Sequence, residues 1–332
     1  MLKKKSFMAD LFFEVCEKLN LDLIMGPVYG AYGQIRSLKN DKRISFFNCC
    51  FDINGYGSGL TARNKGLTRL ILEKNNISMP AGSFFSLRLD DYKHLSLKEL
   101  NSLILMKAQK ITYPVMLKGA DLHRGSCVFK IQNDKELLAK LSLVWKKTDG
   151  VVLEQYLPYN DYRFIVLDGE LIGCYWKKTF QITGDGKKNA KDLIKEAKRN
   201  NKKNTVGANF KGMSQEINNK LLINGYSQAD IIPDGVSIVL TDTSNISKGG
   251  MPVDVTDRIS PEMKKYCRKI ASILNLRFCG IDILSKNIDL APLDSFVLEV
   301  NSSPDMETYY HLGDKQALVI KKVLKKIIME AL

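Results

Sequence analysis

Two oxygen-bearing side chains, Glu299 and Asn301, lie two residues apart between an apolar segment and a Ser-Ser-Pro turn. In a β-strand alternate side chains share a face, so we expect these two to point the same way and Leu298 and Val300 to point into the core. Such oxygen donors at a strand end suit Mg²⁺, which binds through one or two carboxylates plus substrate phosphates. An edge strand with a polar face is the alternative, and it explains this segment on its own.

A second carboxylate, Asp282, lies at the centre of the short apolar segment 280–284. A carboxylate in the middle of a buried strand is unfavourable unless it is paired or metal-bound. If this strand pairs with residues 296–300, Asp282 joins the two polar side chains there, and together they suffice to hold a pair of Mg²⁺ ions on a triphosphate. An Asp that accepts hydrogen bonds from backbone amides accounts equally well for residues 280–284 alone.

Two further segments carry residues suited to a nucleotide. Lys118 ends an apolar segment, and the loop that follows, residues 119–126, contains two glycines. Loop N–H groups together with a Lys commonly bind phosphate. After the apolar segment 151–157, Leu157 and Asp161 could supply an apolar slot for adenine and a carboxylate for the ribose hydroxyls. A strand that ends in a solvated Lys, and a buried strand followed by a polar turn, are the alternatives.

The elements that must position these residues alternate between helical and extended patterns. Helices are expected over residues 7–19, 61–75, 96–109, 134–146, 261–274 and 315–331, and strands over 44–47, 115–118, 127–131, 151–155, 163–167, 171–175, 236–240, 280–284 and 296–300. Asp168-Gly169 predicts a two-residue hairpin turn, and a Lys- and Asn-rich insertion spans residues 187–230. Because the elements do not follow strict βαβ order, the expected class is α+β with antiparallel sheets.

Composition argues against several classes of protein. The chain has 45% apolar and 26% charged residues, as globular enzymes do, and its apolar runs are too short to cross a bilayer. No signal-peptide pattern is present, so we expect a cytoplasmic protein. Seven cysteines without C-x-x-C spacing and only three histidines argue against disulfides, a zinc site or a His-rich metal centre. The net charge is +14, but the Lys residues are spread along the chain without a basic-aromatic stripe, which argues against a nucleic-acid partner.

Taken in order, the segments resemble the ATP-grasp carboxylate–amine ligases, in particular the ATP-grasp portion of cyanophycin synthetase and of bifunctional glutathione synthetases. The segments that carry the resemblance are Tyr32 to Arg36, Ala62 to Lys65 with Leu67-Thr68, Tyr113 to Lys118, Leu153 to Arg163, Thr183 to Lys187, Asn245 to Gly250, Val253 to Asp257, Gly280 to Asp282 and Leu298 to Pro304. The resemblance implies an ATP-grasp fold, in which two α+β subdomains hold the nucleotide and a short N-terminal subdomain precedes them. We place these subdomains at residues 1–68 (N-terminal), 69–157 (central) and 158–332 (C-terminal, with the metal site).

The resemblance also implies roles for particular residues, with ATP and two Mg²⁺ ions as cofactors and Mn²⁺ as an alternative metal. The nucleotide would be bound by Lys65, Lys118, Gly125, Ser126, Glu154, Gln155, Tyr156, Leu157, Asp161 and Asn245. Within this set the two Lys residues would contact the phosphates, residues 154–157 would line the adenine slot, and Asp161 would hold the ribose. The metal ligands would be Asp282, Glu299 and Asn301, and the residues acting at the reacting phosphate would be Arg163, Lys118 and Lys178. Lys177 belongs with Lys178 to a basic pair that the resemblance places near this phosphate.

The implied activity is the ATP-dependent joining of an amino acid or peptide carboxylate to an amine, through an acyl phosphate and with release of ADP and phosphate. One departure from the family is Thr241-Asp242, which stands where the family usually carries positive charge. A second is the loop after Lys118, which has fewer glycines but contains Arg124 as a replacement charge. The alternatives are a ligase that modifies a protein or peptide tail, a nucleotide-binding protein that has lost ligation, and a nucleic-acid-binding module. A homodimer is compatible with the ligase, and no membrane partner is expected.

Overall fold

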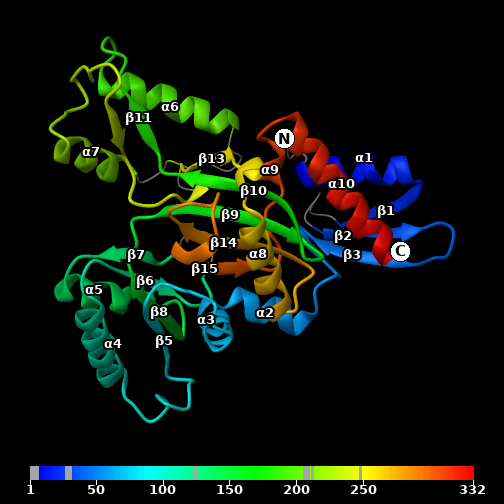
Figure 1. Ribbon diagram of the computed structural model, residues 1–332, viewed down its shortest axis with the longest axis horizontal. Coiled ribbons are helices and arrows are strands. Elements are labelled where there is room, and N and C mark those ends of the chain that lie inside the picture. The colour runs from blue at the N-terminus through cyan, green and yellow to red at the C-terminus, as the bar shows by residue number, and fades with distance from the viewer. Residues whose placement is uncertain (1–6, 27–31, 123–125, 205–209, 211–212, 247–248) are drawn as a thin grey trace.

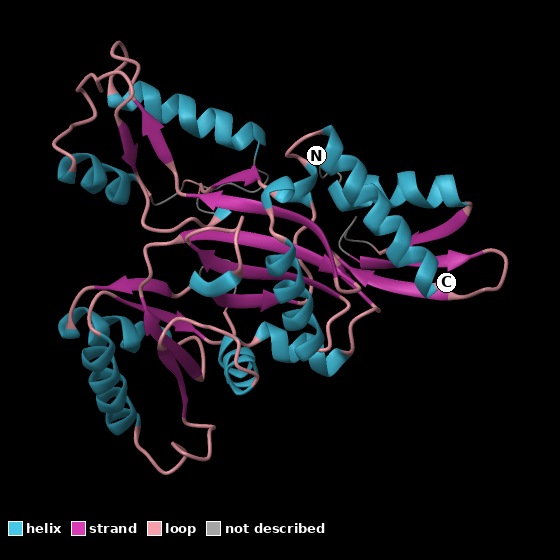
Figure 2. Ribbon diagram, viewed as in Figure 1, coloured by secondary structure: helices cyan, strands magenta, loops and turns pink. Residues whose placement is uncertain are grey.

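The structure is a computed structural model and describes residues 7–26, 32–122, 126–204, 210, 213–246 and 249–332 (Figure 1). The strands form four sheets, and every strand pair within these residues is antiparallel. Helices and strands are mixed along the chain, and the helices cover the sheets (Figure 2). The predicted α+β class with antiparallel sheets is therefore confirmed.

The first sheet packs against helices from both ends of the described chain. It consists of β1 (Leu21–Met25), β2 (Tyr32–Ser37), β3 (Arg43–Phe47) and β4 (Cys50–Phe51). Helices α1 (Phe7–Leu19) and α10 (Asp314–Ala331) cover one face of it (Figure 1). Phe12 of α1, Ile35 of β2 and Leu324 of α10 are all buried in one core. The predicted helices at both ends are confirmed, and the last helix of the chain helps to fold the first subdomain.

The second sheet has the order β5-β8-β6-β7 and lies within the predicted central subdomain. Its strands are β5 (Gly82–Ser86), β8 (Gly150–Gln155), β6 (Val115–Gly119) and β7 (Val128–Ile131). Helices α4 (Leu97–Ile111) and α5 (Asp134–Val144) pack on it through a core of aliphatic side chains. Ser96 begins α4 with a capping box in which its hydroxyl accepts from the Glu99 N–H. The elements expected for this subdomain from the sequence are confirmed to within two residues at their ends.

The third sheet, in the order β13-β10-β9-β14-β15, is the centre of the molecule (Figure 1). Its strands are β13 (Met251–Asp254), β10 (Glu170–Lys178), β9 (Asn160–Leu167), β14 (Phe278–Ser285) and β15 (Ser295–Asn301). The helices near it are α2 (Tyr56–Arg63), α3 (Lys65–Lys74), α8 (Pro261–Ile273) and α9 (Glu307–Tyr310), with short 3₁₀ helices at Thr256–Arg258 and Pro292–Asp294. At the hairpin between β9 and β10, Asp168 (φ 51°) and Gly169 (φ 75°) are both left-handed, which confirms the predicted two-residue turn.

One face of this sheet changes from apolar to charged along its strands. On β9, Ile165 and Leu167 are buried in the core that α1 and α10 share. Alternate side chains of a strand point the same way, so Asp161 and Arg163 lie on the same face of β9 as these two apolar residues. Unlike them, Asp161 and Arg163 belong to a cluster of charged side chains. The opposite face of β9, including Phe164, packs on α8 in a continuous apolar core. The charged part of this face therefore lies beside the core shared with α1 and α10, and the core shared with α8 lies on the other side of the sheet.

A β-bulge interrupts the pairing of β15 with β14. Asp282 pairs with Glu299, but the next residue of β14 pairs with Val297, so Leu298 is an extra residue. Leu298 is half-buried, whereas Val297 and Val300 are fully buried. The expectation that Leu298 points into the core is therefore wrong, because the bulge breaks the strict alternation of side chains. It also directs Glu299 toward the charged face.

The segment expected to be a single helix over residues 61–75 is two helices. The backbone of Asn64 is extended (φ −100°, ψ 109°) and separates α2 from α3. The Asn64 side chain accepts a hydrogen bond from the Leu67 N–H at 3.0 Å and so caps α3. The helical spacing of the apolar residues did not reveal this break, which places Lys65 in the first turn of α3. The proposed boundary between the first two subdomains, after residue 68, falls inside α3.

The insertion between the main strands forms a lobe with its own core. The strands β11 (Gln181–Thr183) and β12 (Ser237–Val239) pair with each other, and α6 (Ala190–Asn204) and α7 (Ser214–Ile223) pack beside them at the upper left of Figure 1. Phe180, Ile217 and Ile238 are among the side chains buried in this lobe. The expected helical insertion and the expected strand at residues 236–240, which is β12, are therefore confirmed, whereas β11 was not predicted.

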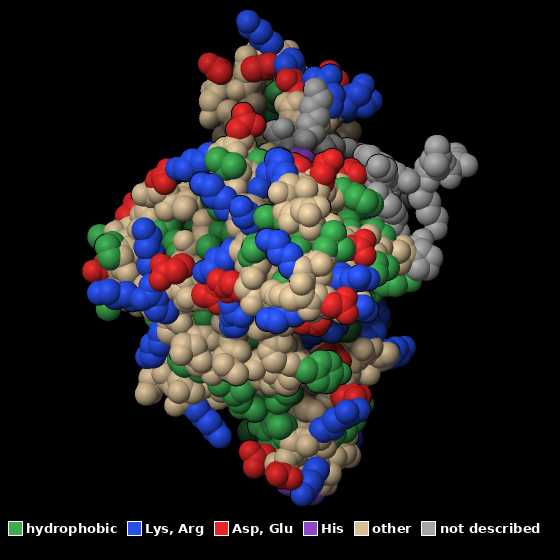
Figure 3. Space-filling model, turned by 90° about the vertical axis from the view of Figure 1, so that its right-hand side faces the viewer, with side chains coloured by type: hydrophobic (Ala, Val, Ile, Leu, Met, Phe, Trp, Pro, Cys, Tyr) green, Lys and Arg blue, Asp and Glu red, His purple; other side chains and the backbone are tan. Residues whose placement is uncertain are grey.

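Basic side chains are scattered on the face that Figure 3 shows, with carboxylates among them. On α10, for example, Lys321 pairs with Glu14 at 2.7 Å and Lys326 pairs with Asp168 at 3.0 Å. All seven cysteines are free thiols, as expected. Across the described ranges, each helix is too short or too polar to cross a bilayer.

The Asn54 side chain joins the first subdomain to the third sheet through four hydrogen bonds. Its amide N–H groups donate to the carbonyl oxygens of Phe278 (2.7 Å) and Ser302 (2.8 Å). Its oxygen accepts from the N–H groups of Arg277 (2.8 Å) and Phe278 (3.0 Å). These contacts fix the start of β14 against the turn that follows β15, and no pattern in the sequence predicted them.

We expect Asn54→Ala to lower the free energy of unfolding by about 2 kcal/mol, because it leaves several partly buried backbone groups without partners. Urea unfolding followed by circular dichroism measures this change. Asn219→Ala, at an exposed position in α7, serves as the control and should stay within about 0.5 kcal/mol of the wild type. Equal stability of the two variants would contradict the role of Asn54.

Candidate functional site

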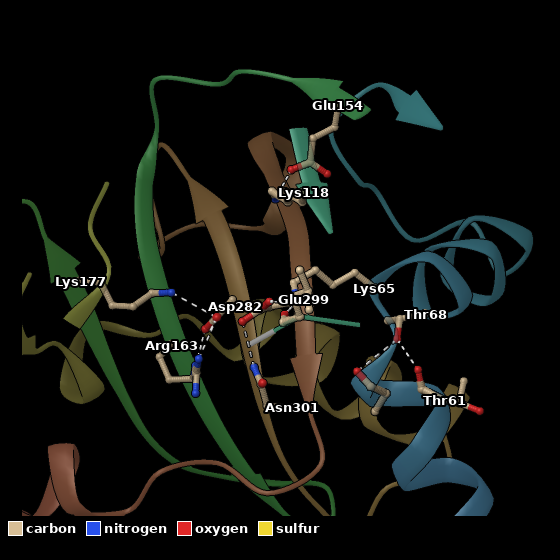
Figure 4. Close-up of polar contacts among 12 residues, drawn as sticks. Thr61, Lys65, Thr68, Lys118, Glu154, Arg163, Lys177, Asp282, Glu299 and Asn301 are labelled. Atoms are coloured by element: carbon tan, nitrogen blue, oxygen red, sulfur yellow. Dashed lines mark hydrogen bonds and ion pairs between the residues drawn. The ribbon is translucent and has the colours of Figure 1, made fainter. Parts of the chain in front are cut away.

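The predicted pairing of the two carboxylate-bearing strands is confirmed. Asp282 on β14 lies directly opposite Glu299 on β15, and Figure 4 shows the two carboxylates side by side on the charged face of the sheet. The side chain of Asp282 is 3% exposed and that of Glu299 is 29% exposed. The Asn301 amide N–H donates to Glu299 Oε1 at 3.3 Å. The three predicted metal ligands therefore form one group.

Cations from the two neighbouring strands hold the buried carboxylate of Asp282. Arg163 on β9 contacts both of its oxygens, with Nη2 2.8 Å from Oδ2. Lys177 on β10 brings its Nζ within 3.2 Å of Oδ2. Burial alone would raise the pKa of Asp282, but the two cations outweigh burial and hold that pKa well below its usual range. Asp282 is therefore a carboxylate in the folded chain.

Asp161 belongs to the same charge cluster. Its Oδ1 lies 2.8 Å from Lys177 Nζ, and its Oδ2 accepts a hydrogen bond from the Ser244 hydroxyl at 2.6 Å. Burial raises the pKa of Asp161, and the neighbouring Asp282 acts in the same direction while Lys177 opposes both. Because both oxygens of Asp161 have partners, ribose binding by this carboxylate requires one of these contacts to be exchanged. Ser244 was not singled out from the sequence.

Lys65 approaches the metal-ligand group from α3. Its Nζ lies 3.3 Å from Glu299 Oε2 and donates to the Leu122 carbonyl oxygen at 2.6 Å. The Lys65 N–H also donates to the Ala120 carbonyl oxygen at 2.7 Å. The first turn of α3 is thus tied to the loop after Lys118, and one of the predicted phosphate-binding cations touches a predicted metal ligand (Figure 4).

Lys118 and Glu154 form a second, more deeply buried group on the central sheet. Lys118 Nζ contacts Glu154 Oε1 across the neighbouring strands β6 and β8. Arg69 of α3 contacts the other oxygen of Glu154 at 3.4 Å and donates to the Pro80 carbonyl oxygen at 2.6 Å. Arg69 is 1% exposed. An Arg on the buried side of the amphipathic helix α3 could have indicated that Glu154 has a cationic partner. The helical spacing of the apolar residues alone did not predict it.

The other predicted site residues are less closely grouped. Gln155 ends β8, while Tyr156 and Leu157 lie in the connection from β8 to β9. Ser126 precedes β7, and Gly125 and Arg124 lie outside the described residues. Lys178 is not in the charge cluster: its Nζ lies 5.5 Å from the centre of the Trp176 ring, and its neighbour Lys177 holds the carboxylates instead. Asn245 lies in the segment between β12 and β13, and its carbonyl oxygen accepts from the Gly250 N–H at 3.0 Å.

The departure at Thr241-Asp242 has a structural explanation. Thr241 is 2% exposed, and its hydroxyl accepts from the Phe180 N–H at 3.2 Å and donates to the Thr243 carbonyl oxygen at 3.1 Å. Asp242 points to Lys220, with 2.5 Å between Oδ1 and Nζ. Thr241 therefore supports the backbone before the segment 244–246 and supplies no charge to the site. Arg163 and Lys177 are the cations that the described residues bring beside Asp282.

The donor set fits a hard cation at Glu299 and Asn301. Two opposed carboxylates and one carboxamide offer the oxygen ligands that Mg²⁺ prefers, and the cations beside them show that these carboxylates attract positive charge. Within the described residues, no cluster of three or more His, Cys, Asp or Glu side chains surrounds a metal position. Substrate phosphates and waters would therefore complete the shell. Asp282 can join it only by exchanging a contact with Arg163 or Lys177.

We expect Arg163→Met to lower the free energy of unfolding by about 3 kcal/mol at pH 7, because it removes a partner of a buried carboxylate. The pKa of Asp282 is lower in the folded chain than in the unfolded chain, where it is about 3.9. The ionised Asp282 carboxylate therefore stabilises the folded chain fully above the unfolded pKa, and this stabilisation is lost as the pH falls through the folded pKa. The gap between wild type and variant should therefore be widest above about pH 5 and shrink in acid.

Urea unfolding of both proteins at several pH values between about 7 and 3 measures this gap. The control is Arg88→Met, which removes one partner of an exposed pair with Asp149 and should change stability by about 0.5 kcal/mol or less at every pH. A gap for Arg163→Met that widens on acidification would mean that Asp282 is not the group it stabilises.

Comparisons with known proteins agree with this geometry. Residues 241–324 match the family described as the RimK-like ATP-grasp domain. The glutathione biosynthesis bifunctional protein of Clostridium perfringens is 27% identical over 260 residues, which cover 76% of this chain and 32% of that protein. The cyanophycin synthetase of a Synechocystis strain is 26% identical over 216 residues, which cover 62% of this chain and 24% of that protein. The chain thus spans about a third or less of the length of these curated relatives.

A solved structure shows the same fold over nearly the whole chain. The bifunctional glutathione synthetase from Pasteurella multocida superposes with a TM-score of 0.65 and 19% identity, over 98% of this chain and 44% of that one. The ATP-grasp fold expected from the motifs is therefore confirmed, and so is the resemblance to the ATP-grasp regions of glutathione and cyanophycin synthetases.

Proposed function

From its ATP-grasp fold and its resemblance to glutathione and cyanophycin synthetases, we propose that this protein is an ATP-dependent ligase that joins a carboxylate to an amine. The observation that carries the proposal is the pair of opposed carboxylates, Asp282 and Glu299, with cations from three other elements around them. Such a site can hold the metal-bound phosphates of ATP and neutralise the charge of the transferring phosphoryl group.

The nucleotide lies, in this proposal, between the central sheet and the charged face of the third sheet. Lys118 and Lys65 contact its phosphates, and the loop with Ser126 covers them. Residues 154–157, from the end of β8 into the connection to β9, line the adenine, and Asp161 and Asn245 complete the ribose and phosphate contacts. The support is that Lys118 and Lys65 are each already paired with a carboxylate, at Glu154 and Glu299. Phosphate binding would replace these ion pairs with contacts between the two Lys side chains and phosphate oxygens.

The metal is held in this proposal by Glu299 and Asn301, with Asp282 as the third ligand. Two Mg²⁺ ions, or Mn²⁺ in their place, would each share phosphate oxygens of ATP with these side chains. When bound, the metal neutralises charge on the β- and γ-phosphates and orients them. Asp282 would exchange one of its contacts with Arg163 or Lys177 for the metal, and the contact that remains would hold the carboxylate in place.

The chemistry follows from positioning rather than from a side-chain nucleophile. A carboxylate oxygen of the first substrate attacks the γ-phosphorus of ATP, the bond to the β-phosphate oxygen breaks, and ADP leaves. The amine of the second substrate then attacks the acyl carbon, inorganic phosphate leaves, and the amine loses a proton as the amide forms. Arg163 and Lys118 balance the negative charge that moves in the first step, and Lys177, rather than its neighbour Lys178, lies in the cluster to assist them.

The substrates we propose are an amino acid or a peptide for both the carboxylate and the amine. One alternative is a ligase that modifies a protein or peptide tail. Another is a nucleotide-binding protein that has lost ligation, which the uncharged Thr241 favours because its hydroxyl is used by the backbone. Assembly as a homodimer is compatible with each of these proposals.

Glu299→Gln should lower ATP turnover by about a hundredfold or more, because it removes a charged metal ligand and a partner of Lys65 while keeping the side-chain shape. The measurement is steady-state ADP release in the presence of Mg²⁺. Asp294→Asn, an exposed carboxylate just before β15 that pairs with Lys286, is the matched control and should retain the wild-type rate. Full activity of the Glu299 variant would refute the metal assignment.

A panel of amino acids and dipeptides separates an active ligase from a protein that has lost ligation. With Mg²⁺ and ATP near 100 times Kd, nucleotide binding should raise the stability of either protein by about 2.7 kcal/mol in a thermal unfolding assay. Only an active ligase should then release ADP at least about tenfold faster when the correct carboxylate and amine are supplied together. Thermal stabilisation without stimulated ADP release across the panel would favour the binding protein.

A further inference from the structure

The inserted lobe contains a groove between α6 and α7 that is separate from the charged face of the third sheet. The groove has a volume of about 550 Å³. Its lining includes the apolar side chains of Ile194 and Ile217 and, beside them, the amides of Asn218 and Gln228. The Gln228 amide N–H donates to Asn218 Oδ1 at 2.6 Å. Ile194 and Ile217 belong to the core of the lobe, so the floor of the groove is built on a packed element.

Positive charge dominates this groove. Four of its lining residues are cations, Lys191, Lys195, Lys198 and Arg199, and none of its described lining residues is a carboxylate. Their spacing of four, three and one residues places them along one side of α6. In the described part of the chain, no carboxylate lies within 4 Å of Lys191, Lys195 or Arg199.

Three carboxylates of the same lobe contact groups outside the lining of the groove. Glu196 of α6 pairs with Lys188 at 2.8 Å, and Asp242 pairs with Lys220 at 2.5 Å. Glu216 of α7 accepts a hydrogen bond from the Asp242 N–H at 2.9 Å. Glu196 lies within electrostatic range of Arg199, but the lining of the groove itself holds four cations and no carboxylate, so an opposite charge from outside would be favoured there.

The groove is connected through α6 to the loop beside the proposed active site. Asn201, near the end of α6, donates a hydrogen bond to the Gly249 carbonyl oxygen at 2.5 Å. Ten residues of helix separate Asn201 from Lys191, or about 15 Å at 1.5 Å per residue. Gly249 follows Ser244 in the same connection of the chain, and the Ser244 hydroxyl donates a hydrogen bond to the Asp161 carboxylate. A partner in the groove would thus sit on the helix that supports this loop.

We propose that the groove between α6 and α7 is a docking site for an acidic peptide segment of a partner protein. Carboxylates of the peptide would pair with Lys191, Lys195 and Arg199, its apolar side chains would cover Ile194 and Ile217, and its backbone would meet the amides of Asn218 and Gln228. A nucleic acid fits less well, because none of the described lining residues is aromatic and base stacking has no platform. The inference goes beyond the ligase reaction, since docking needs neither ATP nor turnover.

The test is fluorescence anisotropy with a labelled ten-residue peptide in which five Glu residues alternate with Leu and Ala. The wild-type protein should bind this peptide, binding should weaken as NaCl is raised, and a matched peptide with Gln for every Glu should not bind. The variant K191E/K195E/R199E should raise Kd by about tenfold or more. The control variant K264E/K265E/K269E makes the same change of charge at exposed positions of α8 and should keep Kd within about twofold of wild type.

Three outcomes would overturn the proposal. One is an unchanged Kd for the α6 variant when its unfolding midpoint matches that of the control variant. Another is equal binding of the Gln peptide, and the third is tighter binding of a ten-nucleotide single-stranded DNA than of the acidic peptide. The salt dependence and the Gln peptide use wild-type protein, so the proposal can fail even if the α6 variant does not fold. Thermal stabilisation by Mg²⁺ and ATP reports separately on the nucleotide site.

Discussion

A buried carboxylate at the centre of the third sheet constrains the rest of this structure. Asp282 is 2% exposed, and a charge removed from water to that degree is stable only if opposite charges and hydrogen bonds replace the lost hydration. Arg163 from β9 and Lys177 from β10 provide them. A shift of one residue in either strand pairing would turn these side chains to the opposite face, which is apolar. The charge cluster and the register of the sheet therefore specify each other.

The same constraint explains why one sheet face is divided into an apolar part and a charged part. Near the hairpin at Asp168 the face is covered by α10 and joins the core of the first subdomain. Further along the strands this cover ends, and the charged residues begin. Asn54 ties the first subdomain to both Phe278 and Ser302, close to the ends of the two carboxylate-bearing strands. The small first sheet and the last helix thus help to hold the two carboxylate-bearing strands in place.

Every cation that the proposed reaction uses is already paired in the structure. Lys118 contacts Glu154, Lys65 contacts Glu299, and Lys177 is shared between Asp161 and Asp282. Such pairs fix long side chains before a substrate arrives, and this reduces the reorganisation that the transfer of a phosphoryl group requires. Glu299 is the most exposed carboxylate of these pairs, at 29%. It is therefore the one whose partner can be exchanged at the smallest cost in desolvation.

The sequence alone was sufficient to predict the main strands and helices, because apolar periodicity, the Ser96 cap and the Asp168-Gly169 turn are local signals. From the residues alone the pairing of the Asp282 and Glu299 strands was one of two alternatives; the resemblance to the ATP-grasp ligases placed the two carboxylates in one site, and they do lie opposite each other. Only the tertiary structure showed which cations meet these carboxylates. Lys177 and Lys178 are adjacent in sequence, and the strand pairing alone selects Lys177 for the cluster.

Other features depended on contacts between distant segments and had no local signal. Asn54 and Phe278 are 224 residues apart, and Arg69 meets Glu154 across 85 residues. The bulge at Leu298 arises from the pairing of two strands and not from the sequence of either one. Local patterns determine which segments are helical, extended or rich in charge. Which charges become partners is decided when the sheet forms, because burial makes only one arrangement of them stable.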